Sequence, residues 1–150
     1  MGYVEAVCIS EKKGVVKKPI AQADLKTDWG IAGDAHAGNW HRQVSLLAGE
    51  SIDGVKDKIP SLALGAFAEN IVTRNINLSA LEIGDRLVVN KKIVLEITQI
   101  GKECHHGCAI RTLTGDCIMP REGLFAKVIT GGRLKPDDII EIDIDKKLAV

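Results

Sequence analysis

Short apolar runs in which polar residues alternate with apolar ones recur along this chain and limit the folds open to it. They include "YVEAVCIS", "RQVSLLA", "ENIVT", "DRLVVN", "KIVLEITQI" and "DIIEIDI", and glycine, aspartate or asparagine residues separate them. A period of two is typical of a strand with one buried face. In residues 93–100, the odd-numbered positions share one face and the even-numbered positions the other. Many short strands without βαβ alternation predict a mainly β fold, a barrel or a curled sheet.

Two segments are predicted to be helical. In residues 45–59, apolar side chains recur at roughly helical spacing, although two glycines weaken the pattern. In residues 119–132, Pro120 suits a first helical turn, Leu124 and Val128 belong to an apolar stripe, and two glycines can end the helix. We therefore expect a single domain over residues 1–150, a barrel or a curled sheet with a few short α-helices.

Length and charge exclude several classes of protein. One domain is the default for 150 residues, and this length can bury a core without disulfides or metal. Lysine plus arginine and aspartate plus glutamate number 20 each, so the net charge is zero, which provides no general attraction to nucleic acid or to an anionic membrane. Aromatic residues make up 3%, which argues against a base-stacking platform.

The cysteines are expected to be thiols in a cytoplasmic protein. The start, "MGYVEAVCIS", lacks the basic and long apolar regions of a signal peptide, and no apolar run approaches the length of a membrane span. In the cytoplasm, Cys8, Cys104, Cys108 and Cys117 should not form structural disulfides. Cys8 lies in an apolar run, and Cys8 and Cys117 are interpreted as small core residues.

Residues 101–117, "GKECHHGCAIRTLTGDC", leave a choice between a structural zinc site and a reactive thiol. Cys104 and Cys108 have a spacing that zinc accepts, but no second tight pair completes a set of four ligands. Lys102 and His105 are cationic groups that favour a thiolate at Cys104, and thiolate is both the nucleophile and a soft metal ligand. We expect the reactive thiol and no stoichiometric zinc.

Two further stretches hold candidate residues. "GIAGDAHAGNWHRQVSLL", residues 30–47, is either a rim loop that offers His36, His41 and Arg42 to an anionic ligand or a surface turn in which Asp34 bonds its own backbone. The residues alone favour the turn. "GAFAENIVTRNINLSALEIGDRLVV" is explained by a strand, a loop and a strand, in which Asn70 could bridge backbone groups of a barrel.

Taken together and in order, these stretches resemble the MOSC family, named for the molybdenum cofactor sulfurase C-terminal domain, and more narrowly its small stand-alone bacterial members. The quoted elements are "GDAHAG", "RQVSLLAGE", "GAFAENIVTRNINLSALEIGDRL", "IVLEITQIGKECHHGCAI" and "MPREGLFAKVITGGRL", and they cover about residues 4–142. The resemblance implies a strand-rich β-barrel that binds molybdopterin-type cofactor or carries activated sulfur as a cysteine persulfide for metal–sulfur cofactor assembly.

The resemblance also implies site residues. A late cysteine is the family's functional group, and Cys104 matches one branch whereas Cys108 matches another, so either is a candidate persulfide carrier or molybdenum ligand. Local chemistry leans to Cys104, because Cys108 precedes an apolar step. The other implied cofactor-binding residues are Gly33, Asp34, His36, Gly38, Arg42, Gln43, Glu69, Asn70 and Lys102. We expect loop 33–43 and segment 101–108 to share one rim.

The resemblance leaves the kind of activity open. The larger sulfurases carry a pyridoxal-phosphate domain, which these 150 residues lack, so no bound pyridoxal phosphate is expected and a donor such as a cysteine desulfurase must supply the sulfur. A molybdoenzyme apoprotein is the expected recipient. Sulfur transfer is one interpretation, and the alternatives are a non-catalytic cofactor carrier or chaperone and a structural metal-binding domain. In "LKPDDII", Asp137 stands where the family more usually has glycine.

Overall fold

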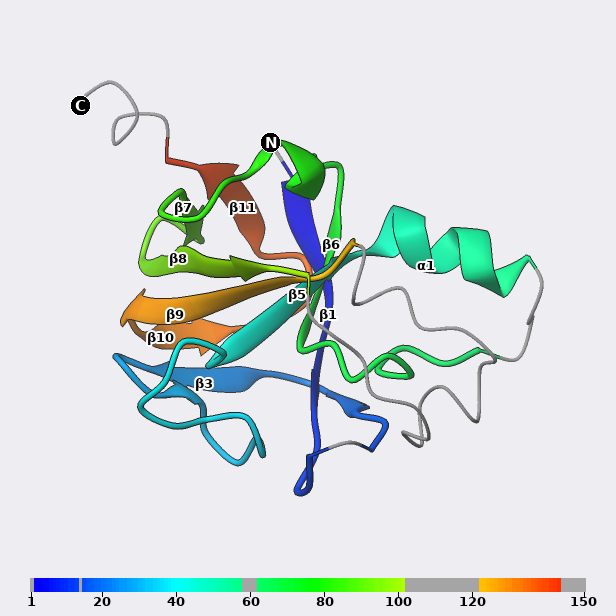
Figure 1. Cartoon of the computed structure of the whole chain (residues 1–150), viewed down its shortest axis with the longest axis horizontal. Coiled ribbons are helices and arrows are strands. Elements are labelled where there is room, and N and C mark those ends of the chain that lie inside the picture. Colours follow the sequence, from blue (N-terminus) through cyan, green and yellow to red (C-terminus); the bar gives the residue numbers. More distant parts are fainter. Residues whose placement is uncertain (1, 14, 58–61, 102–121, 144–150) are drawn as a thin grey trace.

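A closed β-barrel dominates the computed structural model, which describes residues 2–13, 15–57, 62–101 and 122–143 (Figure 1). In order around the barrel, the strands are β1 (Gly2–Ile9), β11 (Ile139–Ile142), β7 (Arg86–Val89), β8 (Ile93–Ile100), β9 (Leu124–Thr130), β5 (Val44–Ala48) and β6 (Ile71–Arg74). β6 pairs again with β1, and only the β5–β6 pair is parallel. The predicted mainly β barrel is confirmed.

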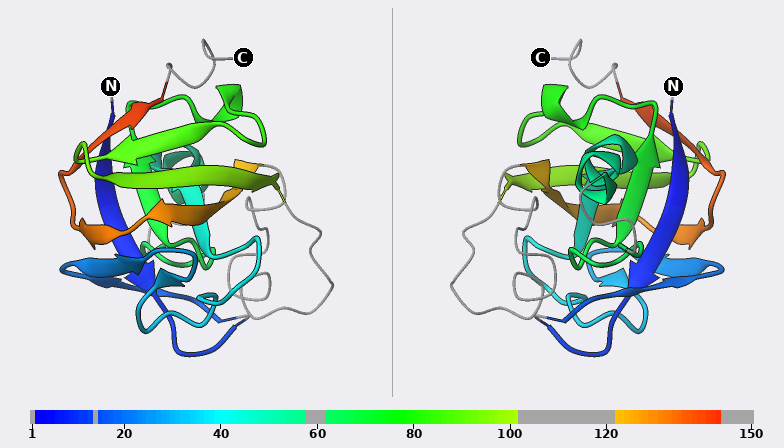
Figure 2. Two further views of the ribbon diagram at one scale, coloured as in Figure 1. Left: turned by 90° about the vertical axis from the view of Figure 1, so that its left-hand side faces the viewer. Right: turned by 90° about the vertical axis from the view of Figure 1, so that its right-hand side faces the viewer.

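The remaining elements lie outside this ring. β2 (Lys18–Ile20) pairs with β1, and β10 (Gly132–Leu134), β3 (Ala23–Lys26) and β4 (Gly30–Ile31) form a second sheet. Figure 2 shows this small sheet below the barrel strands β8 and β9. α1 (Gly49–Lys56) is the α-helix that the structure describes over its whole length, and η1 (Leu78–Ala80) is a 3-10 turn.

The helix predicted over residues 119–132 is wrong over residues 124–130, because these residues form β9. Leu124, Ala126 and Val128 join the core inside the barrel, whereas Phe125 joins a second core outside it. β9 pairs with β5 on one side and β8 on the other. Two ladders and a buried face on each side outweigh the helical start and stop signals.

The other predicted helix is confirmed over part of its length. α1 begins at Gly49, whereas residues 45–48 belong to β5, and residues 58 and 59 lie outside the described part. A Cβ at Gly49 would meet the ends of the Glu5 and Arg74 side chains, so their ion pair would have to shift for a larger residue there. Ile52 is the α1 side chain buried against the wall.

Two apolar cores stabilise the fold. The larger fills the barrel, and the smaller lies between the outer faces of β1, β5 and β6 and a cover made of α1 and residues 62–68. Phe67 and Phe125 are the aromatic members of this outer core. The outer core holds residues 65–68 against the wall, directly before Glu69 and Asn70.

Cys8 is a core residue, as predicted. It is fully buried in the outer core, and burial, with a smaller contribution from the Glu69 carboxylate, raises the pKa of its thiol to about 12. A thiol that remains protonated at neutral pH is a poor nucleophile. Cys8 is therefore the internal reference for an unreactive cysteine in this protein.

Asp137 lies in the turn before β11 and explains the glycine expected at this position. Its φ is +77°, in the left-handed region that glycine adopts at little cost. Its backbone N–H donates to the Val4 carbonyl at 2.7 Å, which ties the turn to β1. Aspartate tolerates this conformation better than most residues do, so the departure from the family pattern affects a turn and leaves the β1–β11 closure intact.

Candidate functional site

Loop 32–43 connects β4 to β5 and holds most of the described site residues. Gly33 has φ +87°, so it turns the chain where a residue with a side chain would be strained. Asp34 is buried and accepts hydrogen bonds from the backbone N–H of Ser10 and of His36, both at 3.1 Å. Gly38 donates its N–H to the Trp29 carbonyl at 2.8 Å. The predicted Asp34 turn is therefore real, but it is buried rather than facing water.

A buried lysine completes this turn. Lys17 Nζ lies 2.6 Å from Asp34 Oδ1, 3.0 Å from His36 Nδ1 and 3.1 Å from Ser10 Oγ, and its side chain is fully buried. Sequence analysis missed Lys17, because it stands in "KKGVVKK", where nothing distinguishes it from three neighbouring lysines. What distinguishes Lys17 is its contact with Asp34. Asp34 lies 17 positions away, and only the fold brings the two side chains together.

The Lys17–Asp34 ion pair is held against a cost of desolvation. Burial is the largest influence on Lys17 and lowers the pKa of its ammonium, and the hydrogen bond to Asp34 opposes that shift. Such a pair does little for stability as a whole, but the loss of one partner leaves an uncompensated buried charge. Asp34 and Lys17 therefore depend on each other.

A cationic and aromatic surface lies next to this cluster. The rings of His36 and Trp40 are stacked with centroids 6.4 Å apart, and Trp40 Nε1 donates to the His36 carbonyl at 2.7 Å. Lys13 Nζ lies 4.4 Å from the centre of the Trp40 ring, and the Arg42 guanidinium lies 6.0 Å from it. Phosphate groups and planar rings are the ligands that such a surface accepts.

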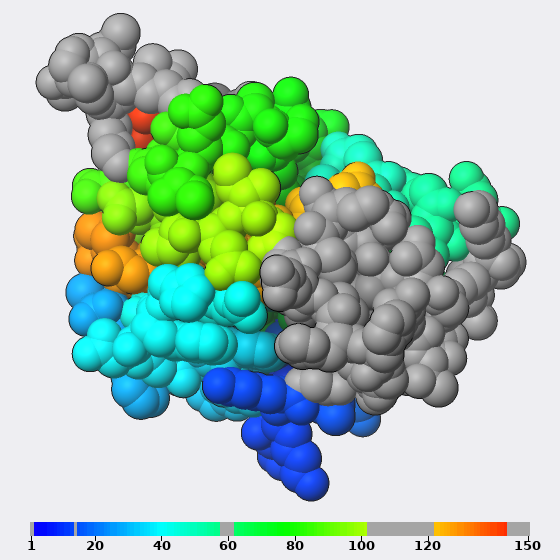
Figure 3. Space-filling view, in the orientation of Figure 1, coloured from blue at the N-terminus to red at the C-terminus, as the bar shows by residue number. Residues whose placement is uncertain are grey.

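Arg42 and His41 reach the end of β8. Arg42 Nε donates to Gln99 Oε1 at 2.9 Å, and His41 Nε2 lies 3.0 Å from the same oxygen. Gln99 Nε2 in turn donates to the Gly101 carbonyl at 2.7 Å. The Arg42 guanidinium lies 5.4 Å from the centre of the Phe125 ring. Phe125 is on the outer face of β9, so Arg42 contacts the barrel from outside. Figure 3 shows the cyan loop lying against the yellow-green end of β8.

Gly101 is the one described residue of segment 101–108, and Gln99 connects it to Arg42 of the loop; that the rest of the segment shares this rim stays a prediction. Lys102, Cys104 and Cys108 lie outside the described residues, so their predicted roles stay predictions.

Gln43 is fully buried and joins three elements. Its Oε1 accepts the N–H of Val128 in β9 at 2.9 Å, and its Nε2 donates to Asp28 Oδ1 at 3.1 Å. Asp28 belongs to the turn between β3 and β4. Both ends of the amide are therefore used to attach the small sheet to the barrel, a structural role that the family resemblance did not imply.

Asn70 bridges backbone groups at the start of β6, as the alternative interpretation from sequence anticipated. Its Oδ1 accepts the N–H of Ser45 at 2.9 Å and the Ser45 hydroxyl at 3.2 Å. Its Nδ2 donates to the Cys8 carbonyl at 3.0 Å. The side chain is fully buried and ties β1, β5 and β6 together.

Glu69 closes the loop that precedes β6. Its carboxylate oxygens accept the N–H of Gly65 at 2.8 Å and of Phe67 at 3.0 Å. Burial is the largest influence and raises the pKa of Glu69, while the two backbone donors oppose the shift. Gly65 itself is required there, because a Cβ would lie 2.0 Å from the Lys17 carbonyl oxygen.

The raised pKa of Glu69 predicts a pH-dependent contribution to stability. A folded-state pKa above the unfolded value gives stability that is fully present below pH 4.5 and is lost as pH rises through the folded pKa. In Glu69→Gln this carboxyl is absent and one backbone N–H loses its acceptor. We expect wild type to be more stable than Glu69→Gln, by an amount that decreases from pH 4 to pH 8.

Urea unfolding of both proteins over that pH range measures the difference. The exposed Glu11→Gln substitution is the control for removal of a carboxylate charge. An advantage of wild type that grows as pH rises would show that Glu69 is preferentially ionised in the folded protein, against the account.

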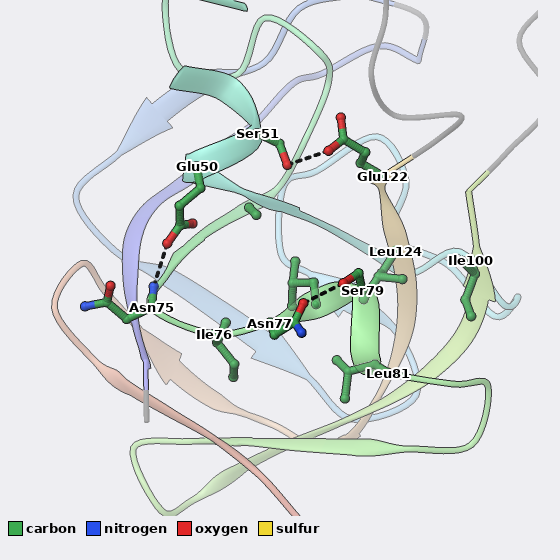
Figure 4. Close-up of a pocket in the computed structure, with 12 residues that line it drawn as sticks. Glu50, Ser51, Asn75, Ile76, Asn77, Ser79, Leu81, Ile100, Glu122 and Leu124 are labelled. Atoms are coloured by element: carbon green, nitrogen blue, oxygen red, sulfur yellow. Dashed lines mark hydrogen bonds between the residues drawn. The ribbon is translucent and has the colours of Figure 1, made fainter. Parts of the chain in front are cut away.

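A cavity of about 670 Å³ lies at the opposite end of β5 and β6, between α1 and the β6–β7 connection. Figure 4 shows the Glu50–Asn75 and Ser51–Glu122 hydrogen bonds beside it. Ile100 lines this cavity, whereas its neighbour Gln99 meets Arg42. None of the site residues implied by the family resemblance is among its described lining residues.

The described residues contain no group of three or more metal-ligating side chains close enough to hold an ion. Among the same residues, no helix is long and apolar enough to cross a membrane.

The fold and this arrangement of residues agree with one protein family. The model of the MOSC domain family matches residues 33–141, well over half of the chain. The chain belongs to the MOSC domain family. This family is associated with molybdenum cofactor sulfurase-like proteins, and the match spans loop 33–43, the Glu69–Asn70 pair and the segment with Cys104 and Cys108.

Several solved structures have a similar fold. YuaD from Bacillus subtilis is 20% identical, with a TM-score of 0.77, and the match covers 95% of this chain and 96% of that one. YiiM from Geobacillus stearothermophilus is 14% identical, with a TM-score of 0.70 and coverage of 95% and 75%. YiiM from Escherichia coli is 18% identical, with a TM-score of 0.66 and coverage of 95% and 69%. The search of curated proteins found no match.

Proposed function

We propose that this protein binds a molybdopterin-type cofactor at the surface of His36, Trp40 and Arg42 and carries sulfur for it as a persulfide on Cys104 or Cys108. One observation carries the proposal: Arg42 is hydrogen-bonded to Gln99, which is bonded to Gly101, directly before "KECHHGC". A cationic loop is thereby held beside the point where the thiol-bearing segment begins.

Chain length supports this juxtaposition. Position 104 follows Gly101 by three residues, and a chain of that length spans about 11 Å at most. A pterin with its phosphate is a ligand of comparable size, so the phosphate and the reacting sulfur of one cofactor could be met by Arg42 and a nearby thiol. Lys102 lies between the two in sequence and adds a cation that favours the thiolate.

The donor set fits an anionic ligand. The bond from Arg42 to Gln99 uses Nε, and in the described residues the two terminal guanidinium nitrogens have no hydrogen-bond partner. Their planar arrangement suits a bidentate contact with phosphate oxygens, and such charge-assisted bonds are about twice as strong as neutral ones. A thiolate beside them is both a sulfur nucleophile and a soft ligand that suits molybdenum.

The sulfur-loading step needs a donor but no pyridoxal phosphate on this chain. The thiolate of Cys104 or Cys108 attacks the outer sulfur of a persulfide on a donor such as a cysteine desulfurase. The donor's S–S bond breaks, a new S–S bond forms on this chain, and the donor leaves as a thiolate, so no oxidant is consumed. A molybdoenzyme apoprotein is the proposed recipient of the finished cofactor.

Cofactor binding is tested with Arg42→Gln. We expect this substitution to weaken retention of molybdopterin by about 10–100-fold, because a hydrogen bond to a charged group contributes about 1.5–3 kcal/mol. Protein is incubated with a source of free cofactor and desalted, and the pterin that remains bound is oxidised and quantified by fluorescence.

Arg133→Gln is the matched control, since Arg133 is an exposed arginine of β10 whose partner is Asp24. Equal retention by wild type, Arg42→Gln and Arg133→Gln would contradict the proposed binding surface.

A further inference from the structure

The hydrogen bonds around Lys17 determine where the protons of this cluster lie. The Ser10 hydroxyl donates its proton to the Lys12 carbonyl at 2.9 Å. Its oxygen therefore has only lone pairs to offer to Lys17 Nζ at 3.1 Å, so Lys17 is the donor in that contact. One of the three protons of a lysine ammonium is thereby assigned.

A second proton is assigned by Asp34. Its Oδ1 receives Lys17 Nζ at 2.6 Å together with the Ser10 N–H, and its Oδ2 receives the His36 N–H. All three contacts come from N–H donors, so in them Asp34 acts only as an acceptor, as a carboxylate does. An ionised, fully buried Asp34 requires a positive counter-charge, and Lys17 is the cation in contact with it.

The third proton of that ammonium points to His36. Lys17 Nζ lies 3.0 Å from His36 Nδ1, and a donor there requires an unprotonated Nδ1. We infer that Lys17 is a positioning residue that holds His36 as a neutral imidazole with its proton on Nε2. A proton on Nδ1 would set two N–H donors against each other at 3.0 Å, and in an imidazolium the two groups would also both be cationic.

The charges around His36 act in both directions. Asp34 Oδ2 lies 3.9 Å from Nδ1 and favours a protonated ring, but the Lys17 ammonium is nearer and occupies the lone pair of Nδ1. Glu69 and Cys8 are the other titratable groups close enough to Lys17 to influence it. Lys13 lies over the Trp40 ring that stacks on His36, so it adds a second cation to this neighbourhood, which also disfavours a charged His36.

Neighbouring residues also fix the orientation of the His36 imidazole ring. Asp34 and Trp40 bond the two backbone groups of His36, and the Trp40 ring stacks nearly parallel to the imidazole, at 4°. The His36 side chain remains 18% exposed. A neutral imidazole with its proton on Nε2 donates a hydrogen bond through that nitrogen, for which a phosphate oxygen is one suitable acceptor, and the contact of Nδ1 with Lys17 disfavours a metal cation there.

The choice of ligand rests on the proposed function, but the protonation of His36 does not. The test is the two-bond ¹H–¹⁵N correlation spectrum of ¹⁵N-labelled full-length protein, with His36 assigned from the His36→Gln spectrum. We expect wild-type His36 to be neutral, with its proton on Nε2, at pH 7 and still neutral at pH 5.5, where an unperturbed histidine is mostly protonated.

Lys17→Met should remove the effect, so that His36 becomes an imidazolium by pH 5.5. Lys18→Met, which removes the neighbouring exposed lysine, should leave the wild-type spectrum unchanged. If Lys17→Met does not fold, the wild-type spectrum still decides. An Nδ1–H tautomer or an imidazolium at pH 7 in wild type would overturn the inference, because Lys17 would then be the acceptor or would not contact the ring as a donor.

Titration of the same sample with inorganic phosphate tests the ligand separately. A shift of the His36 Nε2 signal supports an anion at this residue. No shift at saturating phosphate would count against the anionic ligand of the proposed function, while the protonation of His36 would stand on the spectrum without phosphate.

Discussion

Asn70→Ala is expected to lower the free energy of unfolding by about 3–5 kcal/mol, because each buried polar group left without a partner costs about 1–3 kcal/mol. The substitution leaves the Ser45 N–H and the Cys8 carbonyl without the bonds that Asn70 makes to them, and the site is closed to water. It also opens a small cavity between three strands.

Chemical denaturation of purified Asn70→Ala measures this loss. Asn39→Ala, in an exposed part of loop 32–43, is the matched control and should change the free energy of unfolding by less than about 0.5 kcal/mol. A stable Asn70→Ala protein that has lost only cofactor binding would contradict the structural role and would restore the role implied by the family resemblance.

Asp34→Asn is expected to have an effect of similar size, about 3–5 kcal/mol, because it leaves the Lys17 ammonium buried without its counter-charge. The amide keeps the shape of the side chain, so the loss reports the charge together with the one acceptor oxygen that the amide nitrogen replaces. The combined Lys17→Met and Asp34→Asn variant should be more stable than Asp34→Asn alone, since it removes the uncompensated charge.

Urea unfolding at pH 7 of the two single variants and the double variant completes this cycle. If the losses of Lys17→Met and Asp34→Asn simply add in the double variant, the two side chains are not coupled and the buried ion pair does not exist in solution.

The strands of the barrel could be predicted from sequence because a half-buried strand has its own period. The prediction at residues 124–130 is wrong because Phe125, on the outer face of β9, is buried as well as the residues of its inner face, so the apolar residues do not simply alternate with polar ones and suit a helix equally well. Which interpretation is correct depends on the neighbouring strands β5 and β8, and pairing between distant segments is not visible in a single sequence.

The candidate site, too, could be predicted from the sequence only in part. Polar residues in the loop before β5 indicated a site, and the structure does gather His36, Trp40 and Arg42 there. Gln43, Glu69 and Asn70 were interpreted as cofactor contacts, but their side-chain atoms bond mainly backbone groups of the barrel and its loops. A buried amide or carboxylate looks the same in sequence whether its partner is a ligand or a backbone group.

Persulfide loading of the full-length protein tests the central claim most directly. Protein is incubated with a cysteine desulfurase and cysteine, trapped by alkylation, digested and analysed by mass spectrometry. We predict one added sulfur atom per chain on Cys104 or Cys108, with Cys104 the more reactive, and none on the buried Cys8. Added sulfur only on other cysteines, or none on either Cys104 or Cys108, would contradict the account.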